Sequence, residues 1–296
     1  MPVEPPIETP HSLADAFAAL AGSTADAQIT PIAGGTDVMV RITGEIGEPP
    51  ERMLDLWRLD ELRGISTDGG AVTLGALTTY IDIRRSAPCR EHLPALVDAA
   101  ATIGAAQIQN RGTLGGNIAN ASPAGDTLPV LLALDAEIVV GGTRGERTIP
   151  ASEFWVAYRR TALAPDELIL RIRIPIGGGR EARFRKIGTR RAQAISKVVI
   201  AVAWRDGGGG AWRDARVALG SVADRPIRAR RISRSRPRCR SRAMSSTRIE
   251  EPRRRRPRRY RGVPSAIPIA VTRASVMAAL STRATDRKST RLNSSH

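Results

Sequence analysis

The 296-residue sequence has few of the residues that build metal centres and disulfide frameworks. It contains two cysteines, Cys89 and Cys239, and three histidines. Two cysteines cannot form a disulfide framework, a four-thiolate zinc site or an iron–sulfur cluster, and three scattered histidines do not indicate a metal site. Long apolar runs are also absent: none reaches the ~18 residues of a membrane-spanning helix, and no signal-peptide pattern opens the chain. These absences predict a cytoplasmic protein with no metal site and no membrane partner.

Acidic residues are scarce mainly in the last quarter of the chain. The formal net charge is +17, which is typical of proteins that bind nucleic acid or membrane surfaces. Residues 225–262 carry +15 of this charge and residues 263–296 carry +4, which leaves −2 for residues 1–224. The sequence therefore predicts no nucleic-acid partner for the segment 1–224. A basic nucleic-acid-binding protein stays an alternative that depends on the tail alone.

The tail at 225–296 differs in kind from the rest of the chain. Its arginine runs, such as Arg234–Arg242 and Arg253–Arg256, have neither helical nor strand periodicity, which predicts disorder. Two interpretations are open: a functional basic arm, or out-of-frame translation of GC-rich DNA. The last eleven residues, Asp286–His296, resemble the translation of a sequencing-library adapter. We therefore favour a frameshifted or adapter-derived tail and leave it out of the fold.

The segment 1–224 alternates between helical and strand patterns with short connections, which predicts a mixed α+β fold. Thr9 is the expected cap of a first helix that starts at Pro10 and ends at Gly22. Strands are expected at 53–56, 71–76, 137–140, 168–174, 182–187, 197–204 and 215–222, and helices at 91–103 and 127–133. The turn at 175–180 is the expected boundary between a large first region and a smaller second one.

Two glycine-rich turns carry the strongest chemical signal. The first glycine turn consists of Ile32, Ala33, Gly34, Gly35, Thr36 and Asp37, and the second of Thr113, Leu114, Gly115, Gly116 and Asn117. Glycine pairs allow positive φ and lack a Cβ, so successive backbone N–H groups can converge on an anion such as a dinucleotide's diphosphate. The alternative is that each pair only makes a tight turn. Neither turn is a G-x-G-x-x-G fingerprint or a P-loop.

A carboxylate, that of Asp126, follows the second glycine turn in the sequence. Asp126 lies shortly after this turn and directly precedes the apolar helix expected at 127–133. It is either the N-cap of that helix or a ligand for ribose or ribityl hydroxyls, as acidic residues are in other dinucleotide sites.

Together these segments resemble the flavin-binding (medium) subunit of the molybdenum hydroxylases, the family of xanthine dehydrogenase and aerobic carbon monoxide dehydrogenase. The matching text is Ala-Gly-Gly-Thr-Asp at 33–37, Leu-Gly-Ala-Leu-Thr at 74–78, Thr-Leu-Gly-Gly-Asn-Ile-Ala at 113–119, Ala-Ser-Pro-Ala-Gly-Asp at 121–126 and Asp-Glu-Leu-Ile at 166–169. The resemblance covers about residues 10–225. It implies a PCMH-type (vanillyl-alcohol-oxidase-like) FAD-binding domain with subdomains at 1–56 and 57–176. Residues 181–224 would then be the beginning of an incomplete C-terminal α+β domain.

The resemblance also implies the cofactor and its contacts. FAD would lie with its diphosphate between the two glycine turns, Asp126 would contact its sugar part, and Ile169 would lie against the isoalloxazine ring. Three further positions match flavin-proximal residues of relatives: Ile103, Gln107 and Lys186. For Lys186, a solvated lysine on a strand is the open alternative.

The function implied by the resemblance is electron transfer. In the family, substrate is oxidised at a molybdopterin centre on a separate large subunit, and electrons pass through [2Fe–2S] clusters on a small subunit to FAD and then to NAD or another acceptor. The two cysteines of this chain agree with clusters held elsewhere, and no residue is expected to act as a catalytic acid or base. A stand-alone PCMH-type flavin oxidase is the alternative, but the sequence after residue 225 offers no substrate domain.

Overall fold

The computed structural model describes residues 5–24, 27–43, 48–190, 193–209 and 211–229. Helices and strands alternate along this part of the chain, so the predicted mixed α and β layout is confirmed. The predicted tail lies outside the described residues from position 230 onward. No helix of the described part combines the length and apolar character needed to cross a membrane.

A small parallel sheet opens the fold. Its strands are β1 (Ile7–Glu8), β3 (Arg52–Asp55) and β2 (Ile29–Ile32), in that order. The helices α1 (Leu13–Leu20) and α2 (Val38–Ile42) accompany it. The predicted start of α1 at Pro10 is wrong: the Ser12 side chain accepts a hydrogen bond from the Asp15 N–H and caps the helix there.

A larger antiparallel sheet follows, in the order β4-β5-β10-β6-β7. These strands are β4 (Ile65–Thr67), β5 (Ala71–Gly75), β10 (Leu168–Pro175), β6 (Glu137–Gly142) and β7 (Gly145–Pro150). A 3-10 turn at Asp60–Leu62 leads into this sheet, and a short hairpin of β8 (Trp155–Ala157) and β9 (Arg160–Thr161) precedes β10. The strands predicted around residues 71–76, 137–140 and 168–174 are thereby confirmed.

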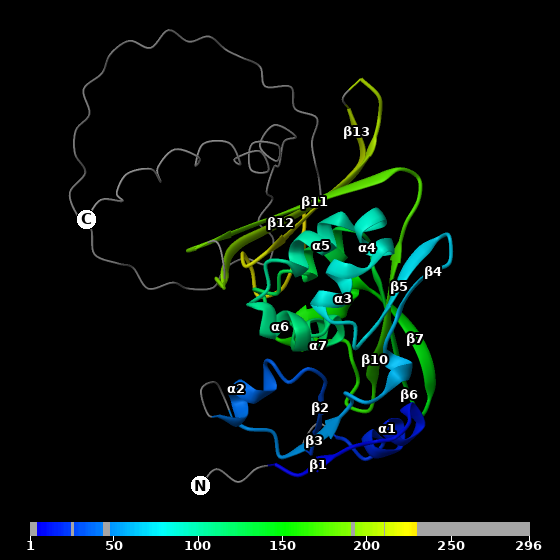
Figure 1. Cartoon of the computed structure of the whole chain (residues 1–296), viewed down its shortest axis with the longest axis vertical. Helices are drawn as coiled ribbons and strands as arrows, with labels where there is room; N and C mark the ends of the chain where they lie inside the picture. Colours follow the sequence, from blue (N-terminus) through cyan, green and yellow to red (C-terminus); the bar gives the residue numbers. More distant parts are fainter. Residues whose placement is uncertain (1–4, 25–26, 44–47, 191–192, 210, 230–296) are drawn as a thin grey trace, which may run out of the picture.

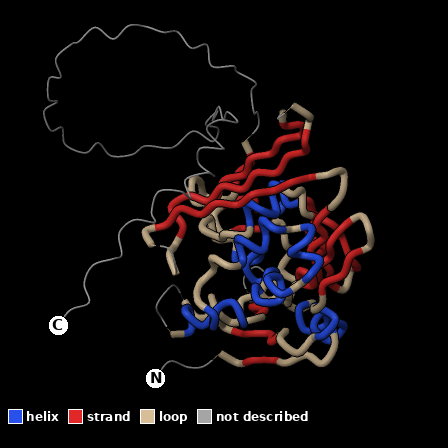
Figure 2. Tube along the Cα trace, turned by 45° about the horizontal axis from the view of Figure 1, so that its top comes forward, coloured by secondary structure: helices blue, strands red, loops and turns tan. Residues whose placement is uncertain are grey.

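A layer of short helices lies between this sheet and a second one, as Figures 1 and 2 show. The helices are α3 (Tyr80–Arg85), α4 (Ala87–His92), α5 (Pro94–Ala100), α6 (Ala106–Arg111), α7 (Leu114–Asn120), α8 (Leu128–Ala133) and α9 (Ala151–Phe154). The single helix predicted at 91–103 is wrong, because Pro94 has no N–H to continue α4 and instead begins α5. The main apolar core forms around these helices.

The C-terminal sheet has the order β11-β12-β13-β14. Its strands are β11 (Arg180–Gly188), β12 (Ser196–Asp206), β13 (Trp212–Gly220) and β14 (Ile227–Arg228). Alternation along β12 places Ala201 and Ala203 in the main core and Val202 and Trp204 in an apolar cluster of their own. Strand β14 was not expected from the sequence, because the segment after Arg225 lacks a strand pattern, yet Ile227 pairs with Leu219.

Candidate functional site

The first glycine turn connects β2 to α2 and touches the chain just before the second glycine turn. A Cβ built on Gly34 would lie 1.7 Å from the carbonyl oxygen of Arg111, a backbone atom that cannot move aside cheaply. Only glycine permits this approach. The structure therefore brings together two segments that lie far apart in the sequence.

The backbone donors of the first glycine turn are left open. None of the N–H groups at 33–37 has a hydrogen-bond acceptor among the described residues, although the Gly35 carbonyl accepts from the Met39 N–H at 2.9 Å. The turn is half-buried from Ile32 to Thr36. Backbone donors that are partly shielded from water need an acceptor, and a run of them is a setting suited to an anion.

The second glycine turn uses its donors within the protein. The N–H groups of residues 114–117 donate to the carbonyl oxygens of Thr78, Ala76 and Thr113 and to the Thr113 hydroxyl. The prediction that this turn presents converging amides is therefore wrong. Its residues instead form the start of α7, which docks on the end of β5: a Cβ on Gly115 would lie 2.7 Å from the Ala76 oxygen. The Asn117 Oδ1 accepts a hydrogen bond from the Thr127 hydroxyl at 2.6 Å. The NH2 of the same side chain is therefore the group that could donate to a ligand.

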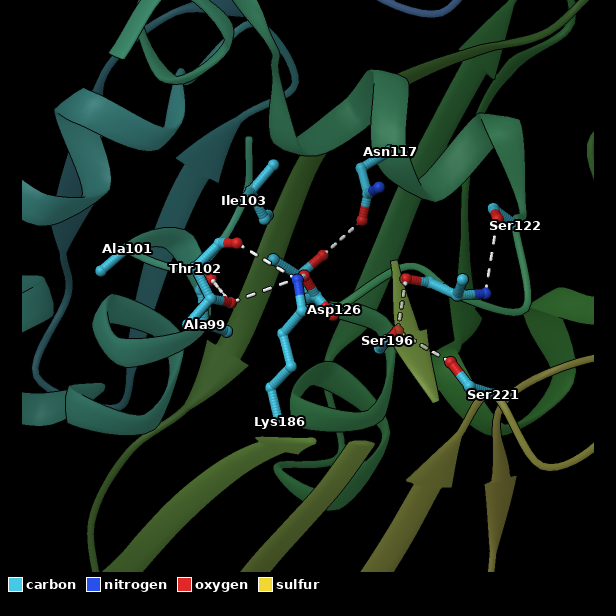
Figure 3. A network of polar contacts seen from close by, with 12 residues as sticks. Ala99, Ala101, Thr102, Ile103, Asn117, Ser122, Asp126, Lys186, Ser196 and Ser221 are labelled. Carbon is cyan, nitrogen blue, oxygen red and sulfur yellow. Dashed lines mark hydrogen bonds and ion pairs between the residues drawn. The ribbon is translucent and has the colours of Figure 1, made fainter. Parts of the chain in front are cut away.

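Asp126 and Lys186 form a buried ion pair (Figure 3). The Lys186 Nζ lies 2.6 Å from the Asp126 Oδ2, and the two side chains are 11% and 6% exposed. Lys186 also donates to the Thr102 carbonyl at 3.2 Å. The interpretation of Lys186 as a solvated strand lysine is thus wrong. The N-cap of α8 is Thr127, so the capping interpretation of Asp126 is wrong as well.

The second oxygen of this carboxylate has no partner. Asp126 Oδ1 is buried and makes no hydrogen bond of normal geometry with the described residues, although the Ser196 hydroxyl lies near enough to the Asp126 carboxyl to help lower its pKa. Burial raises the pKa of Asp126, while hydrogen bonding and the charge of Lys186 oppose that rise. A buried carboxylate oxygen without a donor is costly. This arrangement fits a ligand hydroxyl that donates to Oδ1.

Two serines that the sequence analysis missed hold the loop that carries Asp126. The Ser196 hydroxyl donates to the Ala124 carbonyl at 3.3 Å and lies 2.8 Å from the Ser221 hydroxyl. The Ser221 N–H donates to the Pro123 carbonyl at 2.9 Å. Both serines lie at the ends of strands in the C-terminal sheet, and no local sequence signal marks them.

Tyr80 links the two ends of the site. Its ring packs against Gly112, which directly precedes the second glycine turn: a Cβ on Gly112 would lie 2.7 Å from a ring carbon. Burial raises the pKa of Tyr80 strongly, and the negative charges of Asp37 and Asp126 add to the rise. The charges of both carboxylates therefore act on the same phenol.

A chain of side-chain hydrogen bonds fixes the end of the first glycine turn. The Asn120 Nδ2 donates to the Asp37 Oδ1 at 2.9 Å, and an Arg159 N–H donates to the Asn120 Oδ1 at 3.0 Å. These residues connect the turn to the end of α7 and to the β8–β9 hairpin. Neither Asn120 nor Arg159 was predicted as a site residue, although Asn120 directly follows a matched motif.

The remaining predicted residues lie in three different settings. Ile169 is 6% exposed in the main core, where it pairs with Val140 across β10 and β6. Ile103 is half-buried against the same core and directly follows Thr102 (Figure 3). Gln107 is exposed on α6. That these three lie against the flavin stays a prediction.

Residues 4–177 match the family described as the FAD binding domain in molybdopterin dehydrogenase. The chain belongs to this family. Its cofactor is therefore FAD, and the open amides of the first glycine turn and the unpartnered Asp126 Oδ1 fit a dinucleotide with sugar hydroxyls. Lys186, Ser196 and Ser221 lie beyond the matched residues, so part of the candidate FAD site comes from the C-terminal sheet.

Named relatives agree with this assignment. The chain is 32% identical over 206 residues to the glyceraldehyde dehydrogenase medium chain of Sulfolobus acidocaldarius, and the match covers 69% of this chain and 72% of that one. It is 36% identical over 166 residues to the carbon monoxide dehydrogenase medium chain of Hydrogenophaga pseudoflava, with 56% and 57% covered. The chain thus spans little more than half the length of some relatives that it matches.

Solved structures show the same fold. A carbon monoxide dehydrogenase structure from Hydrogenophaga pseudoflava, which lacks the Mo-pyranopterin moiety of the molybdenum cofactor, superposes with a TM-score of 0.73 at 32% identity, covering 78% of this chain and 79% of that chain. Quinoline 2-oxidoreductase from Pseudomonas putida 86 superposes with a TM-score of 0.71 at 27% identity, covering 78% of each chain.

Proposed function

We propose that this chain is the FAD-carrying electron-transfer subunit of a molybdenum hydroxylase complex. In this proposal a large subunit holds the molybdopterin, a small subunit holds [2Fe–2S] clusters, and FAD on this chain takes electrons from those clusters and passes them to NAD or another acceptor. The support is membership of the family, together with relatives whose names are medium chains and FAD subunits of dehydrogenases. FAD would supply the redox chemistry, and the protein its position and electrostatic environment.

Each part of the site has a defined task in this proposal. The N–H groups at 33–37 donate to the diphosphate of FAD, and the close contact of Gly34 with Arg111 fixes their position. The Asp126 Oδ1 accepts a hydrogen bond from a sugar or ribityl hydroxyl. Lys186 keeps Asp126 ionised and oriented through its 2.6 Å contact with Oδ2.

The apolar residues have a separate task. Ile169, and Ile103 beside Thr102, would provide the apolar contacts of the isoalloxazine ring. In the PCMH-type arrangement that we propose, the cofactor lies between the subdomains at 1–56 and 57–176, and the C-terminal sheet covers its flavin end through Lys186. The observation that carries the proposal is the unpartnered, buried Asp126 Oδ1 close to the ion pair with Lys186.

Loading with flavin tests the proposal. We expect the purified full-length chain to show flavin absorbance, or to acquire it on incubation with FAD, in a ratio of one cofactor to one chain. FAD should bind much more tightly than riboflavin, which lacks the diphosphate and the adenosine. The variant Asp126→Ala should lose most of this binding, whereas Asp98→Ala, at an acid of α5 outside the site, should keep it. A colourless chain that takes up no FAD would contradict the proposal.

A further inference from the structure

A polar cavity lies away from the candidate FAD site, between the end of the five-stranded sheet and the C-terminal sheet. Its volume is about 390 Å³, within the usual range of small-molecule pockets. Its walls come from the end of α8, from the turn between β10 and β11, and from β11, β12 and β13. The residues that line it are Leu134, Asp135, Pro175, Ile176, Gly177, Gly178, Arg180, Arg205 and Arg216.

Positive charge exceeds negative charge around this cavity. Asp214 is shared by Arg180 at 2.6 Å, Arg216 at 3.3 Å and Arg205 at 3.9 Å. Asp135 is shared by Arg216 and Arg228. Four guanidinium groups thus share two carboxylates, which leaves an excess of two positive charges. Desolvation would raise the pKa of Asp214, but the three arginines outweigh it and hold that pKa below its ordinary value.

Donors remain free within this positive cluster. The Arg180 side chain is only 10% exposed, and its Nη1 has no hydrogen-bond partner among the described residues. Arg205 contacts an acid only through the 3.9 Å pair, which is too long for a hydrogen bond. A buried guanidinium N–H without an acceptor is costly, and guanidinium forks match the oxygens of phosphate and carboxylate groups.

The glycine run between β10 and β11 adds backbone donors to the same wall. Gly177, Gly178 and Gly179 all have positive φ, at 114°, 61° and 62°. Their N–H groups have no acceptor among the described residues, and Gly177 and Gly178 line the cavity. A Cβ on Gly178 would lie 2.9 Å from the central carbon of the Arg205 guanidinium, so this glycine lets the guanidinium pack against the peptide. Unpaired amides beside cations form an anion-binding surface.

We propose that this cavity is a binding site for a phosphate or diphosphate group, held by Arg180, Arg205 and the amides of Gly177 and Gly178. The excess of two positive charges suits a doubly or triply charged oxyanion. Such a group is either free in solution or attached to a larger molecule, and the experiment below distinguishes these two sources. The site is separate from the proposed FAD function and does not depend on it.

Calorimetric titration of the full-length, FAD-loaded chain with inorganic pyrophosphate tests the proposal, since loading fills the cofactor's own diphosphate site. We expect saturable binding of one anion per chain. Loss of one charged hydrogen-bonding group corresponds to roughly ten-fold in affinity, so Arg205→Gln should bind about ten-fold more weakly. Arg205 is 46% exposed and makes no close ion pair, so its replacement leaves the fold intact. Arg171→Gln is the matched control: its side chain is 40% exposed, the charge change is the same, and it pairs with Glu146 away from the cavity.

Two further titrations identify the source of the anion. Tighter binding of ADP than of pyrophosphate would show that the group belongs to a larger molecule, and binding of phosphate and pyrophosphate without ADP would show a free anion. Either result supports the site when Arg205→Gln weakens it. Absence of saturable binding, or equal affinity in Arg205→Gln and the unchanged chain, would overturn the proposal. If the chain takes up no FAD, the same titrations of the FAD-free chain and its variants test the site equally well, because Arg205 does not contact the candidate FAD site.

Discussion

At the scale of single residues, the site depends on one missing side chain and one unpaired oxygen. Gly34 lets the first glycine turn touch the Arg111 carbonyl, and Asp126 Oδ1 stays without a donor beside Lys186. The first feature shapes the region in which the diphosphate would lie. The second leaves a buried acceptor without a donor, and a hydroxyl of the cofactor can supply that donor. Each can be tested by a substitution that changes few atoms.

Replacement of Gly34 by alanine should be strongly destabilising. The new Cβ would overlap the Arg111 oxygen at 1.7 Å, so one of the two backbone segments must shift. Overpacking of this kind costs about 1–3 kcal/mol, and the displaced amides should also weaken FAD binding. Gly22→Ala is the control, because no heavy atom lies within 4 Å of its new Cβ. Urea unfolding measures both variants, and a Gly34→Ala chain as stable as Gly22→Ala would contradict this contact.

Replacement of Lys186 by methionine should make stability fall more steeply with pH. Burial raises the pKa of Asp126, so the folded chain binds this proton more readily than the unfolded chain does, and stability is lost as pH rises from the ordinary pKa of 3.8 through the folded value. Without Lys186 that pKa rises further. The variant should lose roughly 3–5 kcal/mol near pH 7 and less near pH 4.

Urea unfolding across this pH range measures the effect. The double variant Asp126→Asn, Lys186→Met should recover much of the loss at pH 7, because no unpaired charge is left in the core. A deficit of Lys186→Met that is the same at every pH would show that the lysine contributes by packing and not by its charge.

At the scale of elements, the loop at 122–126 takes its position from the C-terminal sheet. Ser196 on β12 and Ser221 after β13 hold two of its carbonyls, while α8 follows directly behind it. The loop carries the carboxylate that would contact FAD. The ends of two strands therefore hold the loop that carries the proposed cofactor contact.

Removal of the Ser196 hydroxyl tests this support. Ser196→Ala should lower the free energy of unfolding by about 1 kcal/mol and should speed the release of FAD, because the Asp126 loop loses a hydrogen bond. Ser66→Ala is the control, since Ser66 is exposed on β4. A merely structural serine would change stability alone. Unchanged FAD release from Ser196→Ala would therefore exclude the positioning role.

The sequence predicted these elements unevenly, for physical reasons. Strand β12 follows from its apolar run at 198–204, and β10 follows from apolar residues that alternate with Arg171 and Arg173. The break at Pro94 and the cap at Ser12 are local signals that competed with a longer helical pattern. By contrast, the amides of the second glycine turn meet Ala76 and Thr78, partners from a distant part of the sequence. No local pattern reveals contacts of that kind, and the same holds for Ser196.

At the scale of the whole molecule, the candidate site is assembled from three parts of the chain. The first glycine turn follows β2 of the parallel sheet, Asn117 and Asp126 come from the helical layer, and Lys186 comes from the C-terminal sheet (Figures 1 and 3). The family match ends at residue 177, before Lys186 is reached. In the proposed site the beginning of the C-terminal sheet supplies Lys186, while the basic charge of the chain belongs to the segment that follows this sheet.

Two shortened chains separate these contributions. A chain ending at Ala229 keeps every described contact of the site and should bind FAD as tightly as the full-length chain. A chain ending at Gly177 lacks Lys186 and leaves the Asp126 carboxylate unpaired, so it should bind FAD far more weakly. Any salt-dependent binding of DNA should be confined to the full-length chain, because Arg225 and Arg228 only balance the −2 of residues 1–224 and the chain ending at Ala229 has no net charge. Flavin fluorescence and DNA titration at several salt concentrations measure these outcomes. DNA binding that persists in the chain ending at Ala229 would show that the body itself recognises nucleic acid, and FAD binding by the chain ending at Gly177 would show that the C-terminal sheet is dispensable for the cofactor.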